Sequence, residues 1–189
     1  MNKKIILLLL FLIGIFSICA CGSDGSDSGK NSQSPGSADV GFGCSDPQNF
    51  SDTDLSVIID GKTVMYAKYG FGGKEIALAA ETIVNATMPY VEKLERKETE
   101  VKVTFLKNPI SYRFSHILSV KNGADLSNLS ETDIATLQRD VLSKCDTSGG
   151  GLALAFDSAE AFSGSQMIVI VLHGYYSDND YDYYIGIKF

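Results

Sequence analysis

Residues 167–173, MIVIVLH, most constrain what this chain can fold into, because almost every position in the run is apolar. A strand with this composition is apolar on both faces, which is typical of a central strand covered on both sides. Residues 183–189, YYIGIKF, alternate in hydropathy, and we expect them to pair with 167–173 across the loop 174–182, near the sheet edge. The C-terminal part of the chain therefore predicts the middle of a sheet.

Four further segments have the period-two alternation of strands. Residues 55–69 are expected to form a hairpin that turns at Asp60-Gly61 or Gly61-Lys62. Residues 99–107 place Val101, Val103 and Phe105 on one face, and 152–156 form a shorter strand. The last of the four is the strand over 112–120, whose expected common face consists of Tyr112, Phe114, His116, Leu118 and Val120.

Two helices are expected between these strands. The first begins near Glu75 and carries an apolar stripe, which Pro89 should kink or divide near Met88. The second has a capping signature, with Ser130 as the cap and Asp133 three residues later, and would continue to about Lys144. The resulting order, ββα-ββα-βββ, predicts an α+β fold: a mainly antiparallel sheet of about six or seven strands with two helices packed on it. Residues 41–189 would form this single globular domain.

The N-terminus has the features of an export signal. Lys3 and Lys4 precede fourteen uncharged residues, 5–18, which are too few to cross a bilayer comfortably. The next residues, Ile18-Cys19-Ala20-Cys21, resemble the lipobox of bacterial lipoproteins. That resemblance implies cleavage after Ala20, so that 1–20 is a signal peptide, and a diacylglyceryl group on the Cys21 sulfur. An uncleaved transmembrane helix and an ordinary secretory signal are the alternatives.

Residues 22–40 are rich in serine and glycine and almost devoid of apolar side chains, so 21–40 is expected to be a lipidated cysteine followed by a flexible linker. A coil of this length has a reach of about 25 Å. Gly22 follows the modified cysteine, and in enteric-type bacteria the resemblance then implies the outer membrane. The expected location is the bacterial cell envelope, with the protein membrane-anchored by lipid and facing the periplasm or the surface.

Charge excludes one class of partner. The chain has 16 basic and 23 acidic residues, and loss of Lys3 and Lys4 with the signal leaves 14 basic residues and a net charge of −9. Nucleic-acid binding needs a basic stripe, so no nucleic-acid partner is expected. Electrostatic attraction to anionic lipid headgroups is disfavoured for the same reason.

Cys44 and Cys145 are the two cysteines left after Cys19 departs and Cys21 is lipidated. In an oxidising compartment we expect them to form a disulfide. In the chain-entropy model, a loop of about 100 residues closed in this way contributes up to about 4.7 kcal/mol. The alternative is two free thiols, one of them catalytic.

The loop after residue 174 is the strongest candidate for a recognition surface. Tyrosines there surround aspartates, a combination that makes adaptable contacts at low entropy cost. The residues singled out are Tyr175, Tyr176, Asp178, Asp180, Tyr181 and Asp182. The three aspartates also resemble the start of a calcium loop, but that motif needs glycine at Tyr183 and glutamate at Phe189. A looser calcium site is the alternative; no metal and no cofactor is expected.

Catalytic motifs give little support to an enzyme. GFGGKE, residues 70–75, departs twice from the phosphate-loop pattern. His116 and His173 are the only histidines, and each is expected to be a satisfied strand residue.

The sequence thus predicts a lipid-anchored envelope lipoprotein that acts as a binding or accessory module without catalytic activity, with an envelope protein or a glycan as partner. Two alternatives stay open. One is a secreted hydrolase with His116 or His173 as its base, which a histidine within hydrogen-bond reach of a Ser or Asp would favour. The other is a structural or assembly factor of the envelope.

Overall fold

The computed structural model describes residues 42–44, 54–71 and 77–189. Their strands form two sheets, in which every pairing is antiparallel except that of β5 with β12. The larger sheet has the order β1-β4-β12-β11-β7-β8, and its strands are β1 (Phe42–Cys44), β4 (Ala67–Gly70), β5 (Glu92–Lys93), β7 (Ser111–Lys121), β8 (Ile134–Leu137), β11 (Ser165–Tyr175) and β12 (Asp180–Lys188). The smaller sheet has the order β3-β2-β6-β10-β9, and its strands are β2 (Leu55–Ile59), β3 (Lys62–Val64), β6 (Glu98–Phe105), β9 (Lys144–Asp146) and β10 (Gly151–Asp157).

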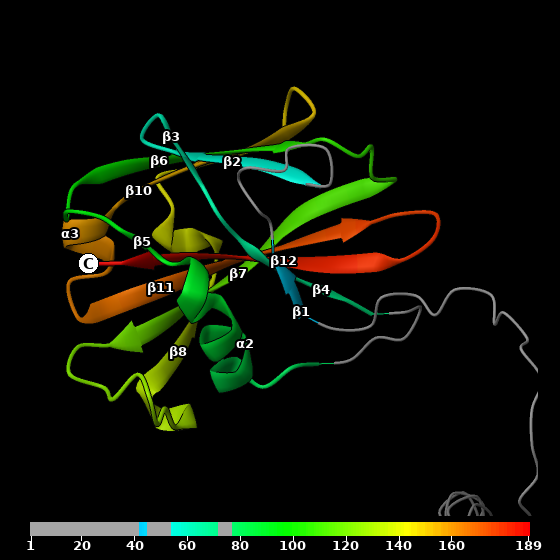
Figure 1. Ribbon diagram of the computed structural model, residues 1–189. Helices are drawn as coiled ribbons and strands as arrows, with labels where there is room; N and C mark the ends of the chain where they lie inside the picture. The colour runs from blue at the N-terminus through cyan, green and yellow to red at the C-terminus, as the bar shows by residue number, and fades with distance from the viewer. Residues whose placement is uncertain (1–41, 45–53, 72–76) are drawn as a thin grey trace, which may run out of the picture. The chain divides into compact units, whose positions relative to one another are not determined.

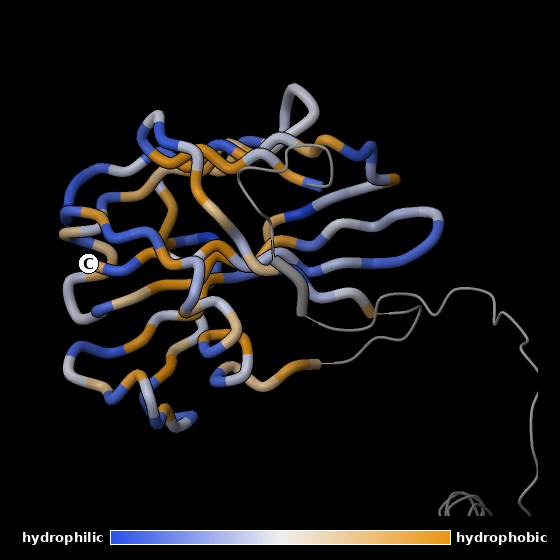
Figure 2. The backbone as a smooth tube through the Cα atoms, in the orientation of Figure 1, coloured by the Kyte–Doolittle hydropathy of each residue, from blue (hydrophilic) through white to orange (hydrophobic). Residues whose placement is uncertain are grey.

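The main core lies between the two sheets, which are stacked in Figure 1. Alternation along β6 points Val101, Val103 and Phe105 into this core, as the sequence predicted. Along β11, Ile170 and Leu172 reach the same core from the opposite sheet. Figure 2 shows the hydrophobic residues concentrated along the facing strands of both sheets. Burial of these two faces against each other is the main source of stability.

A second, smaller core covers the outer face of the larger sheet. Helix α2 (Ala80–Thr87) packs there, with Ile83 and Val84 against Met167 and Val169 of β11. Close packing requires glycine at position 186 of β12, because a Cβ there would lie 2.6 Å from the Cγ2 atom of Thr87. Residues Met167 to Leu172 are therefore buried on both faces, and the prediction of a central strand over 167–173 is confirmed.

The predicted fold class is wrong, because the second helix does not form. Ser130 and Asp133 do make the reciprocal capping bonds, but only around one 3-10 turn, η2 (Glu131–Asp133). The chain then becomes strand β8, which pairs with the edge of β7, and continues through η3 (Arg139–Val141) to β9 in the other sheet. An open sheet edge offers backbone partners that outweigh a local helix signal. The fold is a two-layer, mainly antiparallel arrangement of two sheets, and not two helices packed on one sheet.

The first predicted helix is shorter than expected, but it ends near Met88, where Pro89 was expected to interrupt it. Helix α2 ends at Thr87, and the 3-10 turn η1 (Met88–Tyr90) contains Pro89. The remaining short helix is α3 (Ser158–Ala161), which Asp157 caps with its side chain.

The hairpin predicted over 55–69 is only partly correct. Asp60 and Gly61 form its turn with positive φ angles of 48° and 84°, as a two-residue hairpin turn requires. After Val64, however, the chain leaves the smaller sheet, and β4 joins the larger one. This crossing links the two layers and places Lys68 beside β12.

Two strands differ from prediction in their position or their faces. β12 lies between β4 and β11, so it is an interior strand and not a near-edge one. In β7 the pairing with β11 shifts between Phe114 and His116, which leaves Ser115 as an extra residue. Tyr112 and Phe114 therefore face the main core, whereas Leu118 and Val120 face the outer core. The predicted common face is divided in two.

The predicted disulfide is not present. Cys145 carries a free thiol, and the two cysteines are beyond disulfide distance; the side chain of Cys44 lies outside the described residues. The reason is topological. Thr147, directly after β9, accepts a hydrogen bond from Tyr112 of β7, and three strands separate β7 from β1. At about 4.8 Å per strand this is far more than the roughly 7 Å limit between bridged Cα atoms.

Candidate functional site

Two loops meet at one end of the sandwich, on the right in Figure 1. One joins β6 to β7, and the other is the turn of the β11–β12 hairpin. The Ile110 amide donates a 2.7 Å hydrogen bond to the Tyr175 carbonyl, which fixes the first loop to the second. We call this end the tip surface and define it by Leu106, Lys107, Ile110, Tyr175, Tyr176, Asp178 and Tyr181.

The structure brings the predicted recognition residues together at this tip, but on two sides of the hairpin. Tyr176 and Tyr181 lie on the side of the main core, with their ring centroids 5.7 Å apart in an edge-on pair. Tyr175 and Asp182 lie on the other side, beside His173. Asp178 is exposed at the turn, whereas Asp180 contributes its carbonyl to the Phe71 amide.

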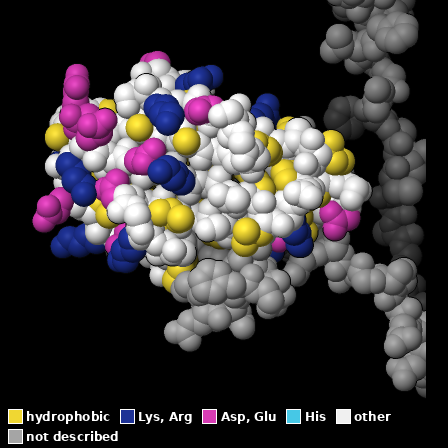
Figure 3. All heavy atoms as spheres, turned by 90° about the horizontal axis from the view of Figure 1, so that it is seen from above, with side chains coloured by type: hydrophobic (Ala, Val, Ile, Leu, Met, Phe, Trp, Pro, Cys, Tyr) yellow, Lys and Arg dark blue, Asp and Glu magenta, His cyan; other side chains and the backbone are white. Residues whose placement is uncertain are grey.

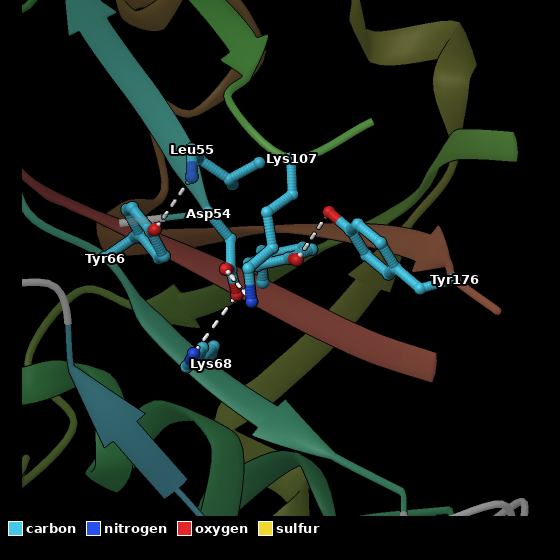
Figure 4. A network of polar contacts seen from close by, with 7 residues as sticks. Asp54, Leu55, Tyr66, Lys68, Lys107 and Tyr176 are labelled. Carbon is cyan, nitrogen blue, oxygen red and sulfur yellow. Dashed lines mark hydrogen bonds and ion pairs between the residues drawn. The ribbon is translucent and has the colours of Figure 1, made fainter. Parts of the chain in front are cut away.

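A buried carboxylate lies behind the tip. Asp54 directly precedes β2, and its side chain is 1% exposed. Lys68 from β4 approaches Oδ2 at 3.1 Å, and Lys107 from the β6–β7 loop approaches Oδ1 at 3.0 Å (Figure 4). Both lysines are more exposed than the acid, at 28% and 62% of their side chains. One buried charge therefore ties segments from both sheets and one tip loop together; we call this group the Asp54 cluster.

Tyrosine hydroxyls complete the Asp54 cluster. Tyr66 accepts a 2.9 Å hydrogen bond from the Leu55 amide, and Tyr183 donates to the hydroxyl of Tyr176 at 2.9 Å. Burial raises the pKa of Tyr66 to about 12, and burial also raises the pKa of Tyr183. The hydrogen-bonding ion pair with Asp54 raises the pKa of Lys107, so this lysine stays charged. The ion pairs of Asp54 and these hydrogen bonds together fasten the tip loop to the sandwich.

The tip also carries two side chains that sequence reasoning missed. Leu106 is 50% exposed and Ile110 is 74% exposed, and they are the large hydrophobic side chains exposed in the described part of the chain. Figure 2 colours two short stretches of this loop as hydrophobic. In Figure 3 the largest gathering of hydrophobic side chains lies at the same right-hand end. The signal in the sequence was this apolar pair, which flanks Lys107-Asn108-Pro109 at the end of the strand predicted over 99–107.

A histidine–aspartate pair occupies the outer face of the same strands. His173 Nδ1 lies 2.5 Å from Asp182 Oδ1, and the Tyr184 hydroxyl donates to the other carboxylate oxygen at 3.4 Å. The imidazole is packed between the rings of Phe71 and Tyr175, at centroid distances of 5.8 and 4.1 Å. Its Nε2 atom is buried and has no hydrogen-bond partner within the described ranges. The ring is thus oriented by a carboxylate.

His116 lies near this pair but is bonded differently. Its Nδ1 atom lies 2.9 Å from the hydroxyl of Ser115, the extra residue of the β7 bulge. Burial lowers the pKa of His116, and the nearby Asp182 carboxylate partly offsets this effect. The serine contacts one histidine and the aspartate the other, so the residues of a Ser-His-Asp relay are present but not connected in series.

Other clusters of polar groups give weaker support for a functional site. An open pocket of about 340 Å³ is lined by Asp140, Asp157 and Glu160 together with apolar neighbours. Within residues 42–44, 54–71 and 77–189, however, no three His, Cys, Asp or Glu side chains are grouped so that they could hold a metal ion. This includes the three aspartates of the hairpin, so the looser calcium site is not formed by these residues in the structure.

Comparison with protein-family models, curated proteins and solved structures finds no match to this chain. The helices in the part of the chain that the structure describes are all too short or too polar to cross a membrane. Cys21 and the segments 1–20 and 21–40 lie outside the described residues. The lipobox therefore stays a prediction from sequence.

Proposed function

We propose that this chain is a lipid-anchored lipoprotein of the bacterial cell envelope and that its domain is a binding module whose recognition surface is the tip. The anchor is supported by the lipobox that ends at Cys21 and by the linker that follows. The recognition role rests on one observation: exposed Leu106 and Ile110 are held beside half-buried tyrosines on a rigid frame.

The rigidity of that frame supports binding. A surface that is ordered before it meets a partner loses less conformational entropy on binding. Asp54 fastens Lys107 of one tip loop to the sandwich, and the Ile110–Tyr175 bond fastens that loop to the hairpin. The tyrosines then present large faces whose side-chain freedom is already restricted by neighbouring rings. The expected partner is an envelope component whose surface is apolar or packs well against tyrosine rings. Such a component is a protein, a glycan or the lipid surface itself.

Two measurements test the proposal. Cys21→Ala should move the protein out of the membrane fraction, and unchanged fractionation would contradict the anchor. For the tip, the double variant Leu106→Asn/Ile110→Asn should lose the component that wild-type protein captures from solubilised envelope extracts. Ala159→Asn, at an exposed position at the other end of the strands, is the matched control and should retain capture. Equal capture by all three proteins would exclude the tip as the recognition surface.

One observation favours a second candidate, a hydrolase that uses His173 as its base. The 2.5 Å contact with Asp182 orients the imidazole through Nδ1 and leaves Nε2 as the atom that would accept a proton. Burial of Nε2, which has no hydrogen-bond partner among the described residues, makes this candidate weaker. Hydrolysis of ester or glycoside substrates that is abolished in His173→Gln, with unchanged folding, would establish it over the binding module.

A further inference from the structure

We propose that the tip surface inserts into the headgroup region of the same bilayer that carries the lipid anchor, with Leu106 and Ile110 as the inserting side chains. This inference names the partner of the proposed recognition surface and rests on that proposed function. It makes the membrane itself, rather than a protein or a glycan, the component that the tip recognises.

The distribution of exposed apolar side chains is the first support. Leu106 and Ile110 are the exposed large hydrophobic residues of the described ranges, and they flank a single turn instead of being scattered. Single exposed apolar residues are ordinary, but a paired display on a protruding, proline-containing loop gives side chains that can enter an interface without unfolding anything. Transfer of such side chains out of water is favourable in proportion to the apolar area they bury.

The neighbours of the two residues suit a membrane interface. Tyr175, Tyr176 and Tyr181 are half-buried, so part of each side chain is exposed at the tip. Tyrosine is enriched at the boundary between hydrocarbon and water because its side chain is amphipathic. Lys107 lies between the two apolar residues with 62% of its side chain exposed, and its ammonium is paired with Asp54, so the charge between the two inserting side chains is already balanced.

The point where the chain enters the domain agrees with this orientation. Phe42, the first described residue, pairs with Tyr69 of β4, and Tyr69 pairs with Asp182 at the hairpin end of β12. The predicted tether between Cys21 and Phe42 therefore joins the domain at the tip end. With a reach of about 25 Å, it brings this end closer to the bilayer than the end that carries the C-terminus.

The charges indicate which force drives insertion. Lys107 at the tip is opposed by Asp178 in the same surface, and the chain as a whole is acidic. Attraction to anionic headgroups cannot dominate, so the apolar side chains must. Insertion should therefore depend weakly on salt and on the fraction of anionic lipid.

The absence of tryptophan from the chain permits a clean experiment. The mature lipoprotein carrying Ile110→Trp is reconstituted into vesicles of phosphatidylethanolamine and phosphatidylglycerol that contain brominated phosphatidylcholine. Its single tryptophan should be quenched by the brominated chains and shifted to shorter emission wavelengths. Ala159→Trp, placed at the opposite end of the strands, should show neither effect. Adding Leu106→Asn to the Ile110→Trp protein should reduce quenching severalfold, and raising the salt concentration should change it little.

Several outcomes would overturn the inference: no quenching in Ile110→Trp, equal quenching in both single-tryptophan proteins, or quenching that disappears in high salt. Intact mass of the mature protein is measured separately. An acyl mass on Cys21 without quenching leaves the anchor standing and rejects the inserted tip. Loss of a captured protein or glycan in Leu106→Asn/Ile110→Asn, together with no quenching, likewise assigns the tip to that partner and rejects the bilayer. No acyl mass on Cys21 refutes the proposed anchor and, with it, this inference.

Discussion

A polar cluster lies on each face of the β11–β12 hairpin, and the two clusters differ in burial and in the segments that they join. On the inner face, Asp54 is almost completely buried and is neutralised by two lysines that reach in from solvent. On the outer face, both partners of the His173–Asp182 pair are partly exposed, at 15% and 21%. The inner cluster joins three distant segments of chain, whereas the outer one joins two neighbouring strands.

The two faces therefore have different roles. The inner cluster holds distant segments of the chain together, and the outer face contains a group that titrates. Tyr66, Tyr183 and Lys107 of the inner cluster keep their protons across neutral pH, because burial raises the pKa values of the two tyrosines and the ion pair with Asp54 raises that of Lys107. Near the outer pair lies His116, whose pKa burial lowers below its ordinary value. Mutations should therefore show their largest effects on the inner face, and mild acidification should act on the outer face.

Asp54→Ala should have the largest effect on stability, a loss of about 2 kcal/mol in the free energy of unfolding. The substitution leaves two ammonium groups close to each other without the carboxylate between them. Because both lysines are partly exposed, water screens part of their repulsion. Urea denaturation measures the change. The exposed Asp178→Ala is the control and should stay within about 0.5 kcal/mol of wild type. Equal effects of the two substitutions would mean that the cluster does not fasten the tip.

Tyr66→Phe should cost about 1 to 1.5 kcal/mol, because the buried Leu55 amide loses its acceptor. The same tyrosine also makes the stability of the protein depend on pH in the alkaline range. Its pKa of about 12 lies above the ordinary value near 10, so the stability it contributes is lost as pH rises through that interval. Thermal melts from pH 9 to 11 should therefore fall more steeply for wild type than for Tyr66→Phe. Parallel slopes would contradict the raised pKa.

Acid should act on the outer face through His116, with an effect smaller than that of Tyr66→Phe. Burial lowers the pKa of His116 in the folded protein, so below about pH 6.5 the unfolded chain binds a proton that the folded chain resists. Stability should decline on acidification, and His116→Gln should flatten that decline. Melting temperatures at pH 7.5 and 5.5 measure this decline. An unchanged decline in the variant would show that His116 does not cause it.

The smallest effect is expected at the tip. Leu106→Asn/Ile110→Asn should change the free energy of unfolding by less than about 0.5 kcal/mol, because both side chains are already in water. Differential scanning calorimetry would show this. A large destabilisation would mean that these residues support the fold, and it would also disqualify the double variant as a probe of binding.

Alternation in the sequence correctly predicted the strands with clear inner and outer faces. β6 and β10 follow the expected pattern, and the apolar run of β11 did identify a central strand. The prediction of a helix over 130–144 was wrong, because its capping residues do form their hydrogen bonds but stabilise only one turn. Local signals also cannot report that β4 leaves one sheet for the other or that β7 contains a bulge, since both depend on partners distant in sequence.

The candidate site was predicted in part. The tyrosines and aspartates of the hairpin were recognised because they are adjacent in the sequence. Asp54, Lys68 and Lys107 were not, since their ion pairs join residues 14 and more positions apart, and each is unremarkable alone. Leu106 and Ile110 look like ordinary strand-end residues until the structure shows that nothing among the described residues covers them.

The interior position of β12 has a consequence for how the molecule is made. Strand β12 lies between β4, which comes from a much earlier part of the chain, and β11. Until residue 180 and its successors have been synthesised, β4 has no neighbour on that side and the largest sheet cannot close. Formation of the larger sheet must therefore wait for β12 and proceed through contacts of long sequence separation, which is a slow route. A ribosome or an export channel would handle an extended chain until β12 emerges.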